Sequence, residues 1–166
     1  MNNETIYHLL GKISIAFASL EHGMVYLLEY LLTKEECSLV AVYILHGMSI
    51  SKLIEKVRLI AKIRLLEHKA VFAKLEEILD NIDEFREQRN LFIHGNWHFN
   101  EEPADNADSV TVVNYKPKLD KKSGKWECLK YEHLTKTELN QLFQDVATVL
   151  SDFRKIDTKI RHVKFT

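Results

Sequence analysis

The sequence predicts a mainly α-helical protein, an antiparallel bundle of four to five helices with a β-hairpin inserted before the last helix. Most apolar residues recur in alternating steps of four and three, which is the period of one helix face. A single segment, residues 109–131, is rich instead in residues that favour strands. The length of 166 residues, with 46% hydrophobic and 28% charged residues, suits one globular domain over 1–166.

The first predicted helix covers residues 6–31. Its most apolar part, residues 13–32, contains Glu21, His22 and Glu29, so we expect a buried core helix and no membrane span. The N-terminus lacks the basic and apolar regions of a signal peptide. We therefore expect a cytoplasmic protein. The apolar stripe of this helix is Ile6, Leu10, Ile13, Phe17, Leu20, Met24, Leu27 and Leu31.

Two shorter helices should follow. Thr33 and Glu36 have the spacing of a capping box, which predicts a short helix over 37–46. Ser49 or Ser51 can cap the third helix. The inner face of the third helix is expected to hold Leu53, Ile54, Val57, Ile60 and Ala61.

The fourth helix is predicted from Lys69 to His94, because Gly95 is a natural stop. Arg89 is the one charged residue in the stripe of this helix. The stripe is Val71, Leu75, Ile78, Ile82, Phe85, Arg89 and Phe92.

A polar loop over residues 100–109 precedes the predicted hairpin. The segments VTVVNY (110–115) and KWECLKY (125–131) flank the turn-like KPKLDKKSG (116–124). Thr135 and Glu138 form a second capping box, which predicts the start of the last helix. Its stripe is Leu139, Leu142, Val146, Val149, Phe153, Ile156 and Ile160.

Arg89 occupies a position that the stripe reserves for apolar residues. A buried guanidinium without a partner costs on the order of several kcal/mol, because its charge loses water. Arg89 therefore either reaches solvent or has a polar partner, and Glu21 is a candidate for that partner. A purely structural arginine, tied to a carboxylate or a helix-end carbonyl, is the competing interpretation.

Asn90 and His94 are spaced i and i+4, so they share one side of a helix. Arg89 and His94 lie about 140° apart at 3.6 residues per turn. Either the reach of arginine or a loosened last turn would let both contact one phosphate. Arginine binds phosphate oxygens in a bidentate manner, and histidine transfers protons near neutral pH.

The run Arg89-Asn90-Leu91-Phe92-Ile93-His94, followed by Gly95, resembles the RxxxxH signature of HEPN domains (higher eukaryotes and prokaryotes nucleotide-binding). The resemblance implies an antiparallel helical bundle and a metal-independent endoribonuclease that acts as a homodimer. It implies that Arg89 stabilises the scissile phosphate, that His94 transfers protons as the 2′-hydroxyl attacks, and that Asn90 positions either group. Glu21 resembles a polar position on the first helix of some members.

The same resemblance implies, for bacterial members, a role as a toxin or defence effector with an inhibitory partner protein. The hairpin over 109–131 is not part of the minimal family pattern. The alternative function is a non-catalytic HEPN-like module for dimerisation, nucleotide binding or protein interaction. In that case His94 is a C-terminal histidine favoured by the helix dipole.

We expect no metal and no cofactor. His94 and His98 have the spacing of a zinc pair, but Gly95 should break the helix between them and no third ligand is evident. Trp97 is expected in core packing. Cys37 and Cys128 lie far apart in sequence and are interpreted as structural thiols of a reducing compartment.

Charged residues cluster in three places. Solvated faces are favoured over RNA contacts for the basic clusters, and the acidic cluster suggests a basic partner or a second subunit. The basic residues are Lys52, Lys56, Arg58, Lys62, Arg64 and Lys69 on the third helix and Lys116, Lys118, Lys121, Lys122, Lys125 and Lys130 in the hairpin. The acidic residues are Glu76, Glu77, Asp80, Asp83, Glu84 and Glu87 on the fourth helix.

Overall fold

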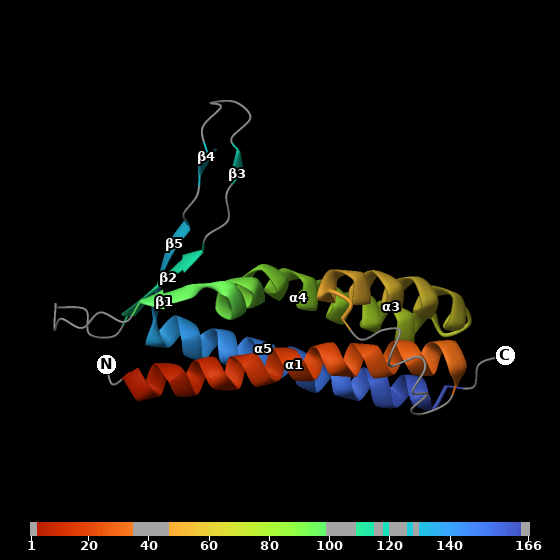
Figure 1. Ribbon diagram of the computed structural model, residues 1–166. Helices are drawn as coiled ribbons and strands as arrows, with labels where there is room; N and C mark the ends of the chain where they lie inside the picture. The colour runs from red at the N-terminus through yellow and green to blue at the C-terminus, as the bar shows by residue number, and fades with distance from the viewer. Residues whose placement is uncertain are drawn as a thin grey trace. The chain divides into compact units, whose positions relative to one another are not determined.

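The computed structural model describes residues 3–34, 47–98, 109–114, 118–119, 126–127 and 130–163 (Figure 1). The helix predicted over 37–46 lies outside these ranges. The described helices are α1 (Asn3–Thr33), α3 (Ile50–Arg64), α4 (Lys69–His94) and α5 (Lys136–Arg161). The strands are β1 (Asn96–His98), β2 (Ser109–Asn114), β3 (Lys118–Leu119), β4 (Trp126–Glu127) and β5 (Lys130–Thr135). The protein is therefore mainly helical, as the sequence predicts.

The chain forms two compact units. The strand-containing unit comprises Met1–Ser14 and Glu87–Gln144. The helical unit comprises Ile15–Arg86 and Asp145–Thr166. Three of the helices, α1, α4 and α5, contribute residues to both units.

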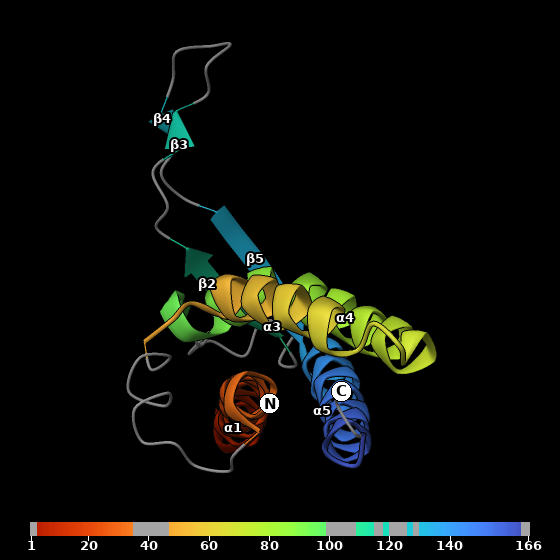
Figure 2. The same ribbon diagram turned by 90° about the vertical axis from the view of Figure 1, so that its right-hand side faces the viewer.

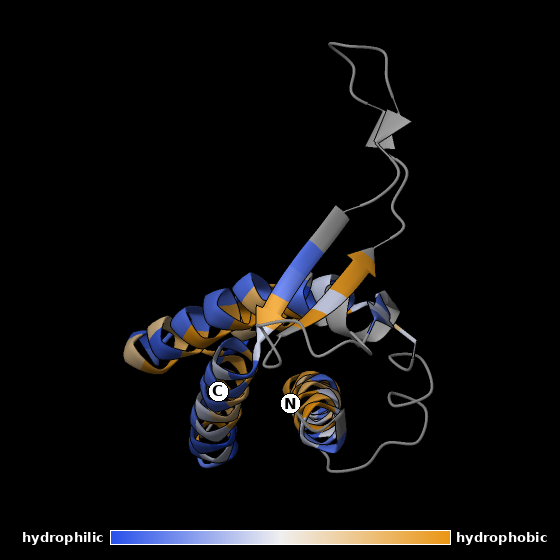
Figure 3. Ribbon diagram, turned by 90° about the vertical axis from the view of Figure 1, so that its left-hand side faces the viewer, coloured by the Kyte–Doolittle hydropathy of each residue, from blue (hydrophilic) through white to orange (hydrophobic). Residues whose placement is uncertain are grey.

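The core of the helical unit consists largely of the apolar stripes predicted from the sequence. The predicted core residues Ile60 and Phe85 are only half-buried, and Leu28 and Leu79 are buried outside the stripes. Removing these aliphatic and aromatic side chains from water stabilises the fold by about 25 cal/mol per Å² of apolar surface. Figure 3 shows hydrophobic and hydrophilic residues divided between the sides of α5. Buried core residues of this unit include Phe17, Leu20, Met24, Leu27 and Leu31 of α1, Leu75, Ile78 and Ile82 of α4, and Val149, Phe153 and Ile156 of α5.

By length and composition alone, α1 is apolar enough to cross a membrane. The apolar stripe of α1 is instead packed against the rest of the protein, since Leu20, Met24 and Leu27 have no exposed surface. One face of α1 therefore belongs to the protein core, as the sequence predicts.

Within the helical unit, α1 and α5 lie side by side and run in the same direction (Figures 1 and 2). They approach closely at Gly23, where an added Cβ would lie 2.8 Å from Cε1 of Phe153. Close to the C-terminal ends of both helices, the Tyr30 hydroxyl donates to the Arg161 carbonyl oxygen at 2.9 Å. The predicted antiparallel arrangement therefore does not apply to this pair.

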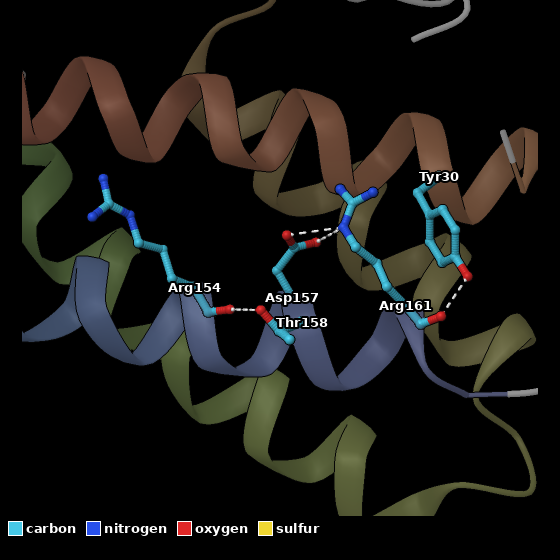
Figure 4. Close-up of polar contacts among 5 residues, drawn as sticks. All are labelled: Tyr30, Arg154, Asp157, Thr158 and Arg161. Carbon is cyan, nitrogen blue, oxygen red and sulfur yellow. Dashed lines mark hydrogen bonds and ion pairs between the residues drawn. The ribbon is translucent and has the colours of Figure 1, made fainter. Parts of the chain in front are cut away.

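Arg161 makes two further contacts, one with α1 and one within α5 (Figure 4). Its guanidinium lies over the Tyr30 ring, 4.9 Å from the centroid. Its Nε donates to both carboxylate oxygens of Asp157 at 3.1 Å. The guanidinium is thus held between an aromatic face and a carboxylate, which fixes the last turn of α5 against α1.

The helices α3 and α4 run antiparallel, as predicted (Figure 2). Arg58 of α3 forms ion pairs with Glu76 and Asp80 of α4. The predicted cap of α3 is confirmed at Ser49, whose side chain accepts from the Lys52 amide.

The last turn of α3 also satisfies the end of α1. Arg64 donates from Nε to the Leu31 carbonyl at 2.9 Å and from Nη2 to the Leu32 carbonyl at 3.1 Å. Carbonyls in the last turn of a helix have no partner within the helix, so a cation that binds them stabilises the helix end.

The strand-containing unit holds an antiparallel sheet in the order β1-β2-β5. The predicted hairpin is confirmed: β2 pairs with β5, with Val112 opposite Glu132, and β3 pairs with β4. The pairing differs from the prediction in three respects. β3 lies inside the segment 116–124, which the sequence predicts as a turn. The second strand continues to Thr135, beyond the predicted limit of 131, and β1 adds a third strand that the sequence analysis missed.

We predict that Gly23→Ala destabilises the protein by about 1–3 kcal/mol, because the new methyl group overlaps the ring of Phe153 in a packed core. Urea unfolding measures this change. The matched control is Gly11→Ala in the same helix, where an added Cβ meets nothing within 4 Å. This variant should be more stable than the natural protein by roughly 0.5–1 kcal/mol. Equal effects of both substitutions would contradict the close contact.

We predict that Tyr30→Phe lowers the free energy of unfolding by about 1 kcal/mol, because the Arg161 carbonyl loses its hydroxyl donor. The control is Tyr26→Phe, which removes an exposed hydroxyl from the same helix. Thermal unfolding of the two variants should show a lower midpoint for Tyr30→Phe only. A similar midpoint for both would mean that the hydroxyl bond contributes nothing.

Candidate functional site

The motif predicted from the sequence lies in the last two turns of α4. The predicted stripe of α4 is confirmed from Val71 to Ile82, which are buried, whereas Phe85 is half-buried and the side chains of Arg89 and Phe92 lie outside the described part of the chain. The helix ends at His94 and Gly95 follows in a bend, as predicted. The backbone is α-helical through His94, so no loosened turn precedes the glycine. Of the two means predicted for Arg89 and His94 of one chain to contact one phosphate, the reach of arginine remains.

Arg89, Asn90 and His94 all belong to the strand-containing unit. The regular helix places Asn90 and His94 on one side. Asn90 is half-buried and has an interaction partner. The side chains of Arg89 and His94 lie outside the described part of the chain. The structure therefore shows where the backbone of the motif lies, and the contacts of its Arg89 and His94 side chains stay predictions.

Glu21 lies in α1, within the helical unit. The residue is half-buried and its Oε1 atom is buried. Glu21 as a whole has an interaction partner. Its burial beside the apolar stripe agrees with a structural carboxylate that serves a polar partner. The predicted contact with Arg89 stays a prediction.

The sheet brings together polar residues that the sequence analysis did not associate. In the register of β1, β2 and β5, His98 is opposite Thr111, and Thr111 is opposite His133. Thr111 Oγ1 and His133 Nδ1 lie 3.0 Å apart, within hydrogen-bond distance. Both histidines are exposed. In the sequence, the only sign of this row of residues is that polar and apolar residues alternate over 96–99. This alternation is too short to predict a strand.

The zinc pair is disfavoured by the same geometry. His94 ends a helix and His98 ends β1, so the two do not share one helix face. Within the described ranges, no group of three or more His, Cys, Asp or Glu residues has the geometry of a metal site. Trp97 lies between the two positions and is half-buried.

The predicted acidic cluster on α4 is largely paired within the chain. Glu76 and Asp80 pair with Arg58, Glu77 pairs with Lys74, and Asp83 pairs with Arg86. These bonds explain most of the acidic cluster without a basic partner. The basic cluster of the hairpin lies almost wholly outside the residues whose side chains are described.

The capping box at the start of α5 is confirmed, and it joins the sheet to the helix. The amide and the hydroxyl of Thr135 donate to Glu138 Oε2 at 2.7 and 2.8 Å, and the Glu138 amide donates to Thr135 Oγ1 at 3.2 Å. These bonds from Thr135 to the carboxylate lower the pKa of Glu138 below its ordinary value of 4.5. The ionised carboxylate therefore stabilises the junction of β5 and α5.

In comparisons with known proteins, no family model, no curated protein and no solved structure matches this chain. Its function must therefore be argued from its own residues.

We predict that Glu138→Gln lowers the unfolding midpoint near neutral pH and that this difference disappears in acid. The folded pKa of Glu138 is lowered, so its stabilisation is complete above pH 4.5 and is lost as pH falls through the lower folded pKa. Thermal unfolding of both proteins across this range tests the sign. The control is Glu84→Gln, an exposed carboxylate without an ion pair in the described part of the chain. A difference that grows in acid would contradict the assignment.

Proposed function

We propose that the protein is a metal-independent endoribonuclease whose site is formed by Arg89, Asn90 and His94. The observation that carries this proposal is the placement of all three in the last two turns of α4, immediately before the stop at Gly95. These three residues supply a cation, an amide and an imidazole. The resemblance of the run to the HEPN signature supports the same chemistry.

In the proposed reaction, His94 removes the proton from the ribose 2′-hydroxyl, or returns a proton to the leaving 5′-oxygen. The 2′-oxygen forms a bond to phosphorus as the bond from phosphorus to the 5′-oxygen breaks. The products are a 2′,3′-cyclic phosphate and a 5′-hydroxyl, so protons and charges balance without a metal. Arg89 neutralises the charge that develops on the phosphoryl oxygens, and Asn90 orients the phosphate or the imidazole.

One Arg and one His form a sparse active site, because the reaction uses both a base and an acid. A homodimer would bring two copies of the motif to one cleft, and a two-fold axis is the commonest symmetry of such assemblies. We therefore propose a cytoplasmic homodimer that cleaves RNA, with a toxin or defence role and an inhibitory partner protein. Glu21 is proposed as a supporting residue of the site.

The second candidate is a HEPN-like module that binds a nucleotide or a protein without cleaving RNA. One observation favours it: the helical unit exposes a row of large aliphatic side chains on α3, as interaction surfaces do. The two functions differ in one measurable respect, which is cleavage by the purified protein.

We predict that the purified protein cleaves total RNA in EDTA and leaves 2′,3′-cyclic phosphate ends. Arg89→Ala and His94→Ala should each reduce the rate by roughly 10²–10⁴-fold, because each removes a group that acts in the transition state. The ends are identified by ligation methods specific for cyclic phosphate. Circular dichroism checks that both variants keep their helical content.

The matched control is His162→Ala, which removes an exposed histidine at the C-terminal end of α5 and should cleave like the natural protein. Three outcomes would contradict the proposal. These are no cleavage by the natural protein, cleavage that EDTA abolishes, and full activity of His94→Ala.

A further inference from the structure

The register of the three-stranded sheet determines which end of the sheet the motif adjoins. β1 begins at Asn96, two residues after His94, so their Cα atoms are at most about 7 Å apart. Asn96 is opposite Val113, next to the last residue of β2. At the same end of the sheet, Asn114 of β2 is opposite Lys130, the first residue of β5. We call this end, defined by Asn96, Asn114 and Lys130, the hairpin end.

The two connections between the strands carry opposite charges. The connection from β2 to β5 contains β3 and β4, and it leaves and returns at the hairpin end. Its sequence from 115 to 130 has six lysines, one aspartate and one glutamate, a net charge of +4. The connection from β1 to β2, residues 99–108, lies at the opposite end and has four acidic residues and no basic one. The sheet therefore separates a basic end from an acidic end, and the motif adjoins the basic one.

The other charges of the strand-containing unit do not cancel this excess. In the last two turns of α4, Glu87 and Arg89 balance one another. Lys118 of β3 is opposite Glu127 of β4, and both are already included in the net charge of +4. Counting Glu132 of β5 as well leaves an excess of three positive charges. The parts of α1 and α5 that belong to this unit each contain one acidic residue and one lysine.

We propose that the hairpin end binds the phosphate backbone of the RNA, beside the bond that Arg89 and His94 cleave. The inference rests on the proposed function, because it names where the substrate of that site is held. Lysines that neutralise phosphates release counterions, and this release drives the association of proteins with nucleic acids. The ligand is the one that an arginine at the motif also binds, so the motif and the lysines engage one continuous strand.

The spacing of the strands places the motif and the lysines on different phosphates. Asn96 and Tyr131 flank Val113 on its two sides in the sheet. Neighbouring strands are about 5 Å apart, so the backbones of these two residues lie roughly 10 Å apart. Lys130 directly precedes Tyr131. It is therefore a binding residue for a phosphate next to the scissile one, and the scissile phosphate belongs to the motif.

The acidic connection gives the bound strand a direction. Residues 99–108 repel phosphates, whereas residues 115–130 attract them. An RNA strand at the motif is therefore drawn toward the hairpin and away from the loop between β1 and β2. An acidic segment of a protein would be attracted to the same lysines, but the adjoining motif offers it no use for an arginine and a histidine. We therefore assign the hairpin end to RNA, and an acidic polymer becomes a comparison in the test.

We predict that the full chain binds a fluorescent single-stranded oligonucleotide of about 20 nucleotides in which every 2′-hydroxyl is methylated. Such an oligonucleotide lacks the attacking group, so binding is measured without cleavage. The double variant Lys118→Gln with Lys130→Gln should bind roughly tenfold more weakly, because two phosphate contacts are lost. Its plot of log affinity against log salt should be shallower by about 1.4, since each contact to a single strand contributes about 0.7. Fluorescence anisotropy measures both quantities.

Two matched controls separate charge from structure. Lys52→Gln with Lys62→Gln removes two exposed lysines from α3, in the other unit, and should leave affinity and salt dependence unchanged. Lys118→Arg with Lys130→Arg keeps both charges and should bind like the natural protein. Circular dichroism checks the helical content of each variant.

Four results would overturn the inference: no binding by the natural protein, an unchanged salt dependence in the Lys118→Gln, Lys130→Gln variant, an equal loss in the α3 control, or equally tight binding of polyglutamate. Cleavage of natural RNA is a separate readout, in which this variant should raise KM and leave kcat unchanged. Binding that depends on the two lysines without cleavage would uphold the hairpin end and overturn the ribonuclease. Cleavage whose KM does not change in the variant would do the reverse.

Discussion

The helical unit depends on the close approach of α1 and α5 at Gly23. Only a residue without a side chain leaves room there for the ring of Phe153, which is itself buried. Packed interiors tolerate extra volume poorly, so this contact fixes how far apart the two helices lie. The apolar stripes on either side of Gly23, with Leu20 and Met24 fully buried, then fit against one another. The hydrophobic effect supplies most of the stabilisation, and Gly23 sets the spacing at which it acts.

Polar groups complete the ends of this core. Tyr30 binds the Arg161 carbonyl, and Arg64 binds the carbonyls of Leu31 and Leu32. Two arginines are thus committed to the ends of α1 and α5, and Arg58 is committed to α4. Lys52 and Lys62 of α3, by contrast, are exposed and form no ion pair with a residue that the structure describes.

The proposed ribonuclease site needs only the end of α4 and the chemistry of Arg89, Asn90 and His94. A folded protein that did not cleave RNA would instead be the interaction module.

The sequence by itself determined the features that depend on neighbouring residues: the helices that the structure describes, the caps at Ser49 and Thr135, the stop at Gly95 and the presence of a hairpin. Periodicity, capping bonds and turns act over a few residues, so they can be predicted from order alone. The candidate motif was found in the same way. Only the tertiary structure decided the third strand β1, the parallel pairing of α1 with α5, and which charged residues pair with one another within the chain. Each of these depends on contacts between residues far apart in sequence, and no local pattern encodes which partner a strand, a helix face or an arginine will meet.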